Sequence, residues 1–402
     1  MPRNIVLLCD GTSNEISEDR TNILRLYGTL AKNTDQIVFY DPGVGTFGAA
    51  NAWSYYYRKA FEIWGLATGW GIDQNVKEAY KFLVQRYDDG KREHGDDVEP
   101  DQIYLFGFSR GAYTARVLAG FIHAIGLIDP INLNLLDYAY RAYKGVSNDT
   151  GGDPPDGSNA SKNHAFAEIR LYERMLRPRR PAIRCIGVFD TVGSVIEWGR
   201  AGPRLRSHAF TKSNKSVQSI RHAVGIDEQR TMFQPQLWPV GCEYWGGPFK
   251  PKKTKPQDVK EVWFSGVHGD VGGGYPESKS QLAKLPLEWM IAETKKMGLK
   301  FKTRTINEIV LGKNDKLKYV QPEPLAKPNK SMNWGWAIIE YLPRRVSTSQ
   351  PAPRRSLFGW YIPLFEERYI PEGAAVHNSV FKRNGTPADL NQPNIPDDFI
   401  EV

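Results

Sequence analysis

Ser109 lies between two glycines in a pattern that is typical of a catalytic nucleophile. The turn at residues 107–111, GFSRG, follows an apolar run at residues 103–106 and precedes a helix-like segment. A serine in such a tight turn needs small residues two positions before and after it, and Gly107 and Gly111 meet this need. The turn exposes the hydroxyl and directs the free N–H groups of the helix at an oxyanion. The pattern therefore predicts a nucleophile at Ser109, although an ordinary strand–turn–helix corner can carry the same five residues.

A serine nucleophile needs a base, and the base needs an acid that orients it. In α/β-hydrolases the chain order is serine, then aspartate or glutamate, then histidine, with the later two on loops that follow strands. Asp190 ends the apolar run at residues 183–189, and His268 follows the short run at residues 262–264. Catalytic groups gather at the carboxyl ends of parallel strands. We therefore predict a triad of Ser109, Asp190 and His268.

The oxyanion formed during attack on an ester needs two hydrogen-bond donors. One is expected from the N–H of Arg110, the residue after the nucleophile. The turn after residues 4–9 is the best source of the second, through Gly11 or Thr12. We expect Asp10 to hold this turn by hydrogen bonds. A helix-entry loop without any catalytic part is the alternative interpretation of the turn.

Asp270 is the main rival to Asp190. It lies two residues beyond His268, so its carboxylate could orient the imidazole ring. Together with His268 and Asp10 it could also form a sparse metal site. The sequence leaves the choice between the two aspartates open, and we expect neither a metal nor a cofactor.

The order of elements predicts an α/β fold with a mostly parallel sheet and helices on both faces, as in α/β-hydrolases. Apolar runs that end in polar turns are typical of strands buried in a parallel sheet, and they occur at residues 4–9, 37–40, 103–106, 183–189 and 262–264. Helix-like segments lie between and after these runs, at residues 20–31, 73–84 and 286–297. Thr21 or Asn22 is the expected N-cap of the first of these helices, and Asp73 that of the second.

The chain divides into two parts by composition. We predict a catalytic domain at residues 1–298 with an insertion at residues 130–180 that could act as a lid. Residues 148–162 are almost exclusively small and polar, which predicts a surface loop. Residues 299–402 have poor periodicity, and we expect them to form an irregular C-terminal cap packed on the core.

The composition excludes some classes of protein. Three cysteines lie far apart in 402 residues, so neither a zinc ribbon nor a disulfide framework is supported. The N-terminus lacks the apolar region of a signal peptide, and no apolar run is long enough to span a membrane. We therefore expect a protein that is cytoplasmic as synthesised. A net charge of +8 favours anionic partners such as phospholipid head groups or nucleic acid, and it does not choose between them. A basic surface that only aids solubility is the alternative interpretation.

Six segments of the chain, in order, resemble the DUF2235 family of α/β-hydrolase domains, which includes the Tle1-type phospholipase effectors of the type VI secretion system. The segments are LLCDGTSNE at 7–15, VFYDPGVGT at 38–46, GLATGWGIDQNVKEAYKFL at 65–83, IYLFGFSRGAYTAR at 103–116, GVFDTVGSV at 187–195 and WFSGVHGDVGGGY at 263–275. By this resemblance the family's serine, aspartate and histidine fall on Ser109, Asp190 and His268. The resemblance also implies a secretion-system or immunity protein as partner, and delivery to the periplasm of a target cell without a cleaved signal peptide.

The residues and the resemblance together predict a serine hydrolase that cleaves carboxylic esters, with lipids or phospholipids as the favoured substrates. We expect peripheral membrane contact and no nucleic-acid partner. A cytoplasmic carboxylesterase that acts on a small soluble ester is one alternative, and a non-catalytic lipid- or protein-binding module is another. An exposed apolar surface at residues 130–180 or after residue 300 would favour lipid.

Overall fold

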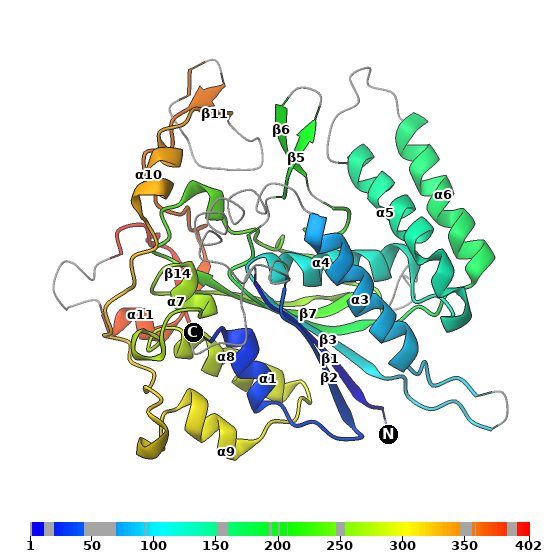
Figure 1. Cartoon of the computed structure of the whole chain (residues 1–402), viewed down its shortest axis with the longest axis horizontal. Helices are drawn as coiled ribbons and strands as arrows, with labels where there is room; N and C mark the ends of the chain where they lie inside the picture. Colours follow the sequence, from blue (N-terminus) through cyan, green and yellow to red (C-terminus); the bar gives the residue numbers. More distant parts are fainter. Residues whose placement is uncertain are drawn as a thin grey trace, which may run out of the picture.

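In the described part of the chain, eight parallel strands form the central sheet (Figure 1). The computed structural model describes residues 2–11, 20–43, 70–92, 95–150, 160–192, 195–199, 202–206, 208–246, 254–345, 356–357, 359–383 and 392–402. The strands lie in the order β14-β13-β10-β7-β4-β3-β1-β2, and every neighbouring pair is parallel. Their bounds are β1 (Asn4–Cys9), β2 (Gln36–Asp41), β3 (Gln102–Phe108), β4 (Ile183–Phe189), β7 (Val217–Gly225), β10 (Asp258–Phe264), β13 (Ala374–Val376) and β14 (Phe399–Glu401).

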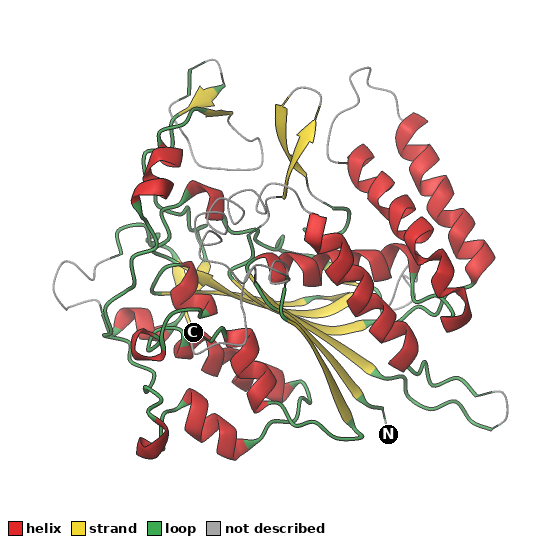
Figure 2. Cartoon of the chain, in the orientation of Figure 1, coloured by secondary structure: helices red, strands yellow, loops and turns green. Residues whose placement is uncertain are grey.

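Helices cover both faces of this sheet (Figure 2). Ile5 and Leu7 of β1 pack into one core with α3 (Trp70–Arg86), α4 (Arg110–Ile125), α5 (Leu136–Thr150) and α6 (Ala160–Leu176). Val6 and Leu8 pack into a second core with α1 (Asn22–Thr29) and α8 (Lys284–Lys296). Because successive side chains of a strand point to opposite faces, a strand between two cores must be apolar throughout. The predicted α/β class and the predicted helices on both faces are confirmed.

Two local predictions turn out differently. Asp73 lies inside α3 instead of capping it, and its carboxylate accepts hydrogen bonds from Tyr140 Oη at 2.9 Å and Lys144 Nζ at 2.5 Å. It therefore ties α3 to α5. The predicted loop at residues 148–162 is helical at both ends, because α5 extends to Thr150 and α6 begins at Ala160. Residues 151–159 lie outside the described residues.

A third local prediction is confirmed. The N-cap of α1 is Thr21, whose side chain accepts a hydrogen bond from Leu24 N at 3.1 Å.

The segment after residue 298 both covers the core and extends the sheet. Its strands β13 and β14 are hydrogen-bonded to β10 and to each other. Its other elements are α9 (Thr303–Thr305), η5 (Ile306–Val310), η6 (Asp315–Leu317), α10 (Trp334–Glu340), α11 (Asn378–Phe381) and the antiparallel pair β11 (Arg344–Arg345) and β12 (Trp360–Tyr361). None of the helices in the described ranges is long and apolar enough to cross a membrane.

The remaining elements are short and connect the larger ones. They are η1 (Pro130–Leu135), β5 (Val195–Gly199), β6 (Gly202–Arg206), η2 (Thr231–Phe233), β8 (Glu243–Tyr244), β9 (Lys255–Pro256), α7 (His268–Gly272) and η4 (Glu277–Lys279). Of these, η2 and α7 lie beside the candidate active site.

Candidate active site

Ser109 occupies a sharp turn between β3 and α4. Its backbone has φ 56° and ψ −120°, a conformation that residues other than glycine rarely adopt. The two flanking glycines are required by space. A Cβ on Gly111 would lie 2.1 Å from the carbonyl oxygen of Cys9, and one on Gly107 would lie 2.4 Å from the carbonyl oxygen of Gly111. The turn is therefore wedged against the end of β1, as the predicted nucleophile elbow would require.

Asp190 follows the strand next to the elbow strand. Phe108 of β3 is paired with Phe189 of β4, so Ser109 and Asp190 leave the sheet at the same level. The N–H of Ser109 donates to the carbonyl oxygen of Phe189 at 3.1 Å. His268 begins α7 after β10, and its Nδ1 lies 2.5 Å from Oδ2 of Asp190. The fold thus brings the predicted acid and the predicted base into direct contact.

Aromatic side chains enclose the His268 ring. The ring centres of Phe108 and Phe233 lie 4.7 and 4.9 Å from that of the imidazole. Burial lowers the pKa of His268 from its ordinary value of 6.5, and the hydrogen bond and charge of Asp190 oppose that fall. A neutral imidazole with Nδ1 directed at a carboxylate has Nε2 left to act as a base.

The predicted nucleophile and the predicted base are not hydrogen-bonded to each other in the described structure. Ser109 directly follows Phe108, whose ring packs on His268. Among the hydrogen bonds of the described residues, none joins Ser109 Oγ to the imidazole. Catalytic hydrogen bonds are often long in a protein without substrate and tighten when the substrate binds.

Asp270 has other partners than His268. Its Oδ2 accepts from the N–H groups of Val267 and Asn329 at 3.1 and 3.0 Å, and its Oδ1 accepts from Asn329 Nδ2 at 2.6 Å. These contacts stabilise the first turn of α7, which carries His268. The geometry therefore favours Asp190 over Asp270 as the acid that orients the ring. Within the part of the chain that the structure describes, no group of three potential metal ligands occurs.

Asp10 organises the turn that follows β1. Its Oδ1 accepts from the N–H of Gly11 at 2.7 Å, and its Oδ2 accepts from Thr21 Oγ1 at 2.5 Å and from Tyr40 Oη at 2.9 Å. The N–H of Gly11 is thus directed at Asp10 in this conformation. Thr12 lies outside the described residues, so the source of the second oxyanion donor stays a prediction.

The first predicted oxyanion donor lies at the start of a helix. Arg110 is the first residue of α4, and the N–H groups of a first helical turn point out of the start of the helix. This position suits the N–H of Arg110 to an oxyanion beside Ser109.

Arg368 is a site residue that the sequence did not reveal. Its guanidinium donates from Nη1 to Oδ1 of Asp190 at 2.6 Å and from Nη2 to Oδ2 at 2.8 Å. Burial alone would raise the pKa of Asp190, but the charge of Arg368 and the hydrogen bond from His268 hold that pKa well below its usual range. Arg368 belongs to an irregular stretch between β12 and β13 and carries no motif.

Glu228 is a second residue near the site that no sequence pattern indicated. It is fully buried, and its Oε2 accepts from the backbone N–H of His268 at 3.2 Å. Burial would raise its pKa, but the hydrogen bonds and charge of Arg230 bring the pKa of Glu228 down to about 2. The ion pair of Glu228 and Arg230 therefore anchors the start of α7.

Comparison with known proteins places the chain in a family. An uncharacterised protein of Saccharomyces cerevisiae (strain ATCC 204508 / S288c) is 25% identical over an alignment 425 residues long, and the alignment covers 76% of this chain and 59% of that protein. An uncharacterised protein from Pseudomonas aeruginosa of known structure is 21% identical, with a TM-score of 0.38, over 75% of this chain and 46% of the other. The structure of a Tle1 effector bound to the VgrG spike of the type VI secretion system is 17% identical, with a TM-score of 0.33, over 70% of this chain and 53% of the other.

The chain thus spans between about half and three fifths of the length of these relatives. Residues 3–293 match the family described as the T6SS phospholipase effector Tle1-like catalytic domain, and this range contains Ser109, Asp190 and His268. The match covers most of the chain. The chain therefore belongs to the family of Tle1-like phospholipase effectors of the type VI secretion system.

Proposed function

We propose that the protein is a serine hydrolase that cleaves a carboxylic ester of a phospholipid. The hydrogen bond of 2.5 Å between Asp190 and His268, formed beside the strained elbow that carries Ser109, is the observation that supports it best. A buried carboxylate on Nδ1 of a histidine fixes the tautomer in which Nε2 can accept a proton. A pure binding module has no need of that arrangement.

In the proposed reaction Oγ of Ser109 attacks the ester carbonyl while Nε2 of His268 takes the hydroxyl proton. The N–H of Arg110 and a second donor from the turn after β1 stabilise the oxyanion. The N–H of Gly11 can serve only if it leaves Asp10, so Thr12 is the favoured source of the second donor. The tetrahedral intermediate collapses, the leaving alcohol takes the proton from His268, and the acyl group stays on the serine. Water then attacks the acyl-enzyme with His268 again as base, which releases the fatty acid and restores Ser109.

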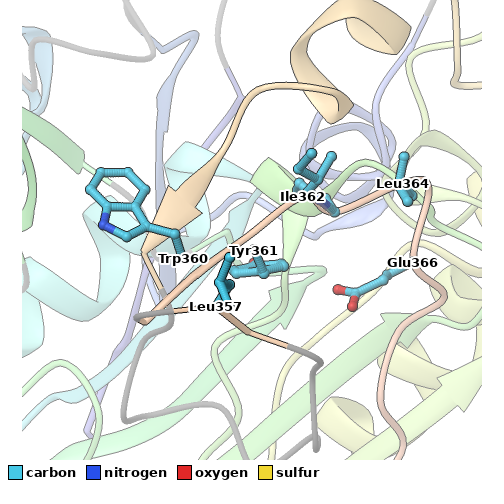
Figure 3. Close-up of a pocket in the computed structure, with 7 residues that line it drawn as sticks. Leu357, Trp360, Tyr361, Ile362, Leu364 and Glu366 are labelled. Carbon is cyan, nitrogen blue, oxygen red and sulfur yellow. The ribbon is translucent and has the colours of Figure 1, made fainter.

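An exposed apolar surface supports a lipid substrate over a small soluble one. We call it the apolar rim, and it consists of Trp334, Ile338, Tyr341, Leu342, Leu357, Trp360, Ile362 and Leu364. Trp334 and Leu357 are 82% and 73% exposed. A pocket of about 530 Å³ opens within the rim, and Figure 3 shows that it is lined by apolar side chains and by the carboxylate of Glu366. Exposed apolar patches of this kind are typical of surfaces that contact lipid or protein.

The apolar rim is linked to the active site through two aromatic rings. Trp336 of α10 (orange in Figure 1) lies edge-on to Phe233 with ring centres 5.3 Å apart, and Phe233 lies 4.9 Å from His268. The buried carboxylate of Glu340 accepts from the N–H of Thr231 at 2.9 Å, which fixes α10 to η2. A lipid docked on the rim would thus lie near the catalytic base. Because of its family, we also propose that the protein is delivered to a target cell and that it binds a secretion-system partner such as the spike protein.

Hydrolysis of phospholipid vesicles beside a soluble short-chain ester tests the proposal, with Ser109→Ala as the inactive control. We expect the wild-type protein to release fatty acid from vesicles and Ser109→Ala to release none. Turnover of the soluble ester alone would replace the proposal by a carboxylesterase. Failure on both esters with retained vesicle binding would support a non-catalytic lipid-binding module.

The apolar rim makes a separate prediction. The double variant Trp334→Ser, Leu357→Ser is expected to hydrolyse vesicles about tenfold more slowly, because two large apolar side chains are lost from the proposed lipid contact. Its rate on the soluble ester should stay unchanged. Val240→Ser is the control, since Val240 is fully exposed and lies outside both the rim and the insertion at residues 130–180. An equal loss on both substrates would mean that the rim does not contact lipid.

A further inference from the structure

Arg368 is buried at the centre of the site, although it lies far from the triad in sequence. Only 1% of its surface is exposed. Besides its two hydrogen bonds to Asp190, it donates from Nη1 to the carbonyl oxygen of Gly225 at 2.7 Å and from Nη2 to the carbonyl oxygen of Phe233. A planar guanidinium that donates to four acceptors has little freedom to turn.

The carboxylate of Asp190 is held on both oxygens. Oδ1 accepts from Arg368 at 2.6 Å and from the N–H of Gly225 at 3.0 Å. Oδ2 accepts from Arg368 at 2.8 Å and lies 2.5 Å from Nδ1 of His268. The last torsion of an aspartate side chain is soft, so its carboxylate plane is set by its partners. The fork of Arg368 fixes that plane, and the plane directs Oδ2 at the imidazole.

We propose that Arg368 is a positioning residue of the hydrolase: it fixes the plane of the Asp190 carboxylate and offsets its charge, and so sets both the orientation of His268 and the pH range in which His268 is a base. The catalytic part of this inference rests on the proposed function. The coupling of Arg368, Asp190 and His268 does not rest on the proposed function, because these contacts exist in the protein without substrate.

The positive charge of Arg368 is expected to lower the pKa of His268. Without it, the buried Asp190 carboxylate would lose its counter-ion and would stabilise the imidazolium more strongly, which raises the pKa of His268. Since the base must be neutral, the acid limb of the kcat/KM profile would move to higher pH. The other ionisable groups around the pair are Glu228 and Arg230 beside His268, His222 near Asp190, and Asp227 near Arg368.

Three variants separate positioning from mere structural support. Arg368→Met removes both fork and charge, and Arg368→Lys keeps the charge without the fork. Arg383→Met is the matched control, because Arg383 is an equally buried arginine of the same segment that donates to the carbonyl oxygens of Pro324 and Ala326 at 2.6 and 2.9 Å.

We expect Arg368→Met to lower kcat about 100-fold with little change in KM, and to move the acid limb up by about one pH unit. Arg368→Lys should lower kcat about tenfold and leave the acid limb near that of the wild type. In an Asp190→Asn background, Arg368→Met should cause no further loss, because its effect acts through Asp190. Arg383→Met should leave the acid limb in place.

NMR titration of the His268 ring gives a readout that needs no turnover. In the wild type the Nδ1 proton shared with Asp190 should give a far-downfield resonance, and in Arg368→Met this resonance should weaken while the ring titrates at higher pH. If Arg368→Met does not fold, Arg368→Lys should still weaken the resonance.

Two results would overturn the inference. One is a His268 titration in Arg368→Met that matches the wild type or, if that variant does not fold, an unweakened downfield resonance in Arg368→Lys. The other is an equal shift in Arg383→Met. A wild-type protein that hydrolyses no ester, with a His268 titration that still depends on Arg368, would reject the proposed function and keep the coupling.

Discussion

Asparagine in place of Asp190 is expected to lower kcat for ester hydrolysis by about 10⁴-fold. The new amide has nearly the same shape as the carboxylate, so it can still fill the space between Arg368 and His268. Arg368 presents only donors to it, and the amide oxygen must therefore face the guanidinium. The amide NH₂ is then left opposite Nδ1 of His268, which becomes the acceptor. The tautomer with the proton on Nε2 cannot take a proton from Ser109.

Asp270→Asn is the matched control for this substitution, and the pair of variants decides between the two aspartates. Asp270 contacts Val267 and Asn329 at the start of α7, so its replacement should lower kcat by less than about tenfold. Initial rates on a soluble ester measure both effects. Both variants should be assayed well below their unfolding temperatures, because Asp190→Asn leaves a buried guanidinium without its counter-ion and destabilises the fold. A larger loss in Asp270→Asn would assign the orienting role to Asp270.

The sequence predicted five of the eight strands in the described sheet and missed β7, β13 and β14. The clearest of the five are buried on both faces. The runs at residues 4–9 and 183–189 are apolar almost throughout, and such runs have few alternatives to a central parallel strand. The three-residue strands β13 and β14 are too short to show any period, so residues 299–402 were expected to be only a cap. The resemblance to Tle1-type effectors is confirmed by the family match.

The order of strands explains why the proposed triad residues lie at the same edge of the sheet. Ser109 and Asp190 follow adjacent strands, and His268 follows β10, which is separated from β4 only by β7. The sequence could place each residue after a strand, and parallel strands share one carboxyl edge. It could not give the strand order or the choice between Asp190 and Asp270, because both depend on contacts between distant segments.

The arginine beside Asp190 could not be found from the sequence. A buried carboxylate needs a charged or hydrogen-bonding partner, so some partner for Asp190 was required. With 53 lysines and arginines in the chain, that requirement does not select one of them. Arg368 lies in a stretch without regular structure, and only the folded chain shows that it is there.

Alanine in place of Gly111 is expected to destabilise the protein by about 3 kcal/mol and to abolish most of the hydrolytic activity. The added Cβ would lie 2.1 Å from the carbonyl oxygen of Cys9 and 2.4 Å from that of Asp10, both in the backbone. Backbone atoms of a central strand and the turn after it cannot move aside as the end of a side chain can. Helix α4 must therefore shift away from β1.

A shift of α4 moves the elbow with it, because Ser109 is the N-cap of that helix. Displacement of a nucleophile by about 1 Å is enough to lower a rate about 100-fold. Urea unfolding and ester hydrolysis measure the two effects. Gly145→Ala is the control, since a Cβ on Gly145 in α5 would meet nothing within 4 Å and should raise stability by up to about 1 kcal/mol. A Gly111→Ala variant as stable and as active as the wild type would contradict this prediction. It would mean that the turn tolerates a separation of α4 from β1 despite its close contacts with β1.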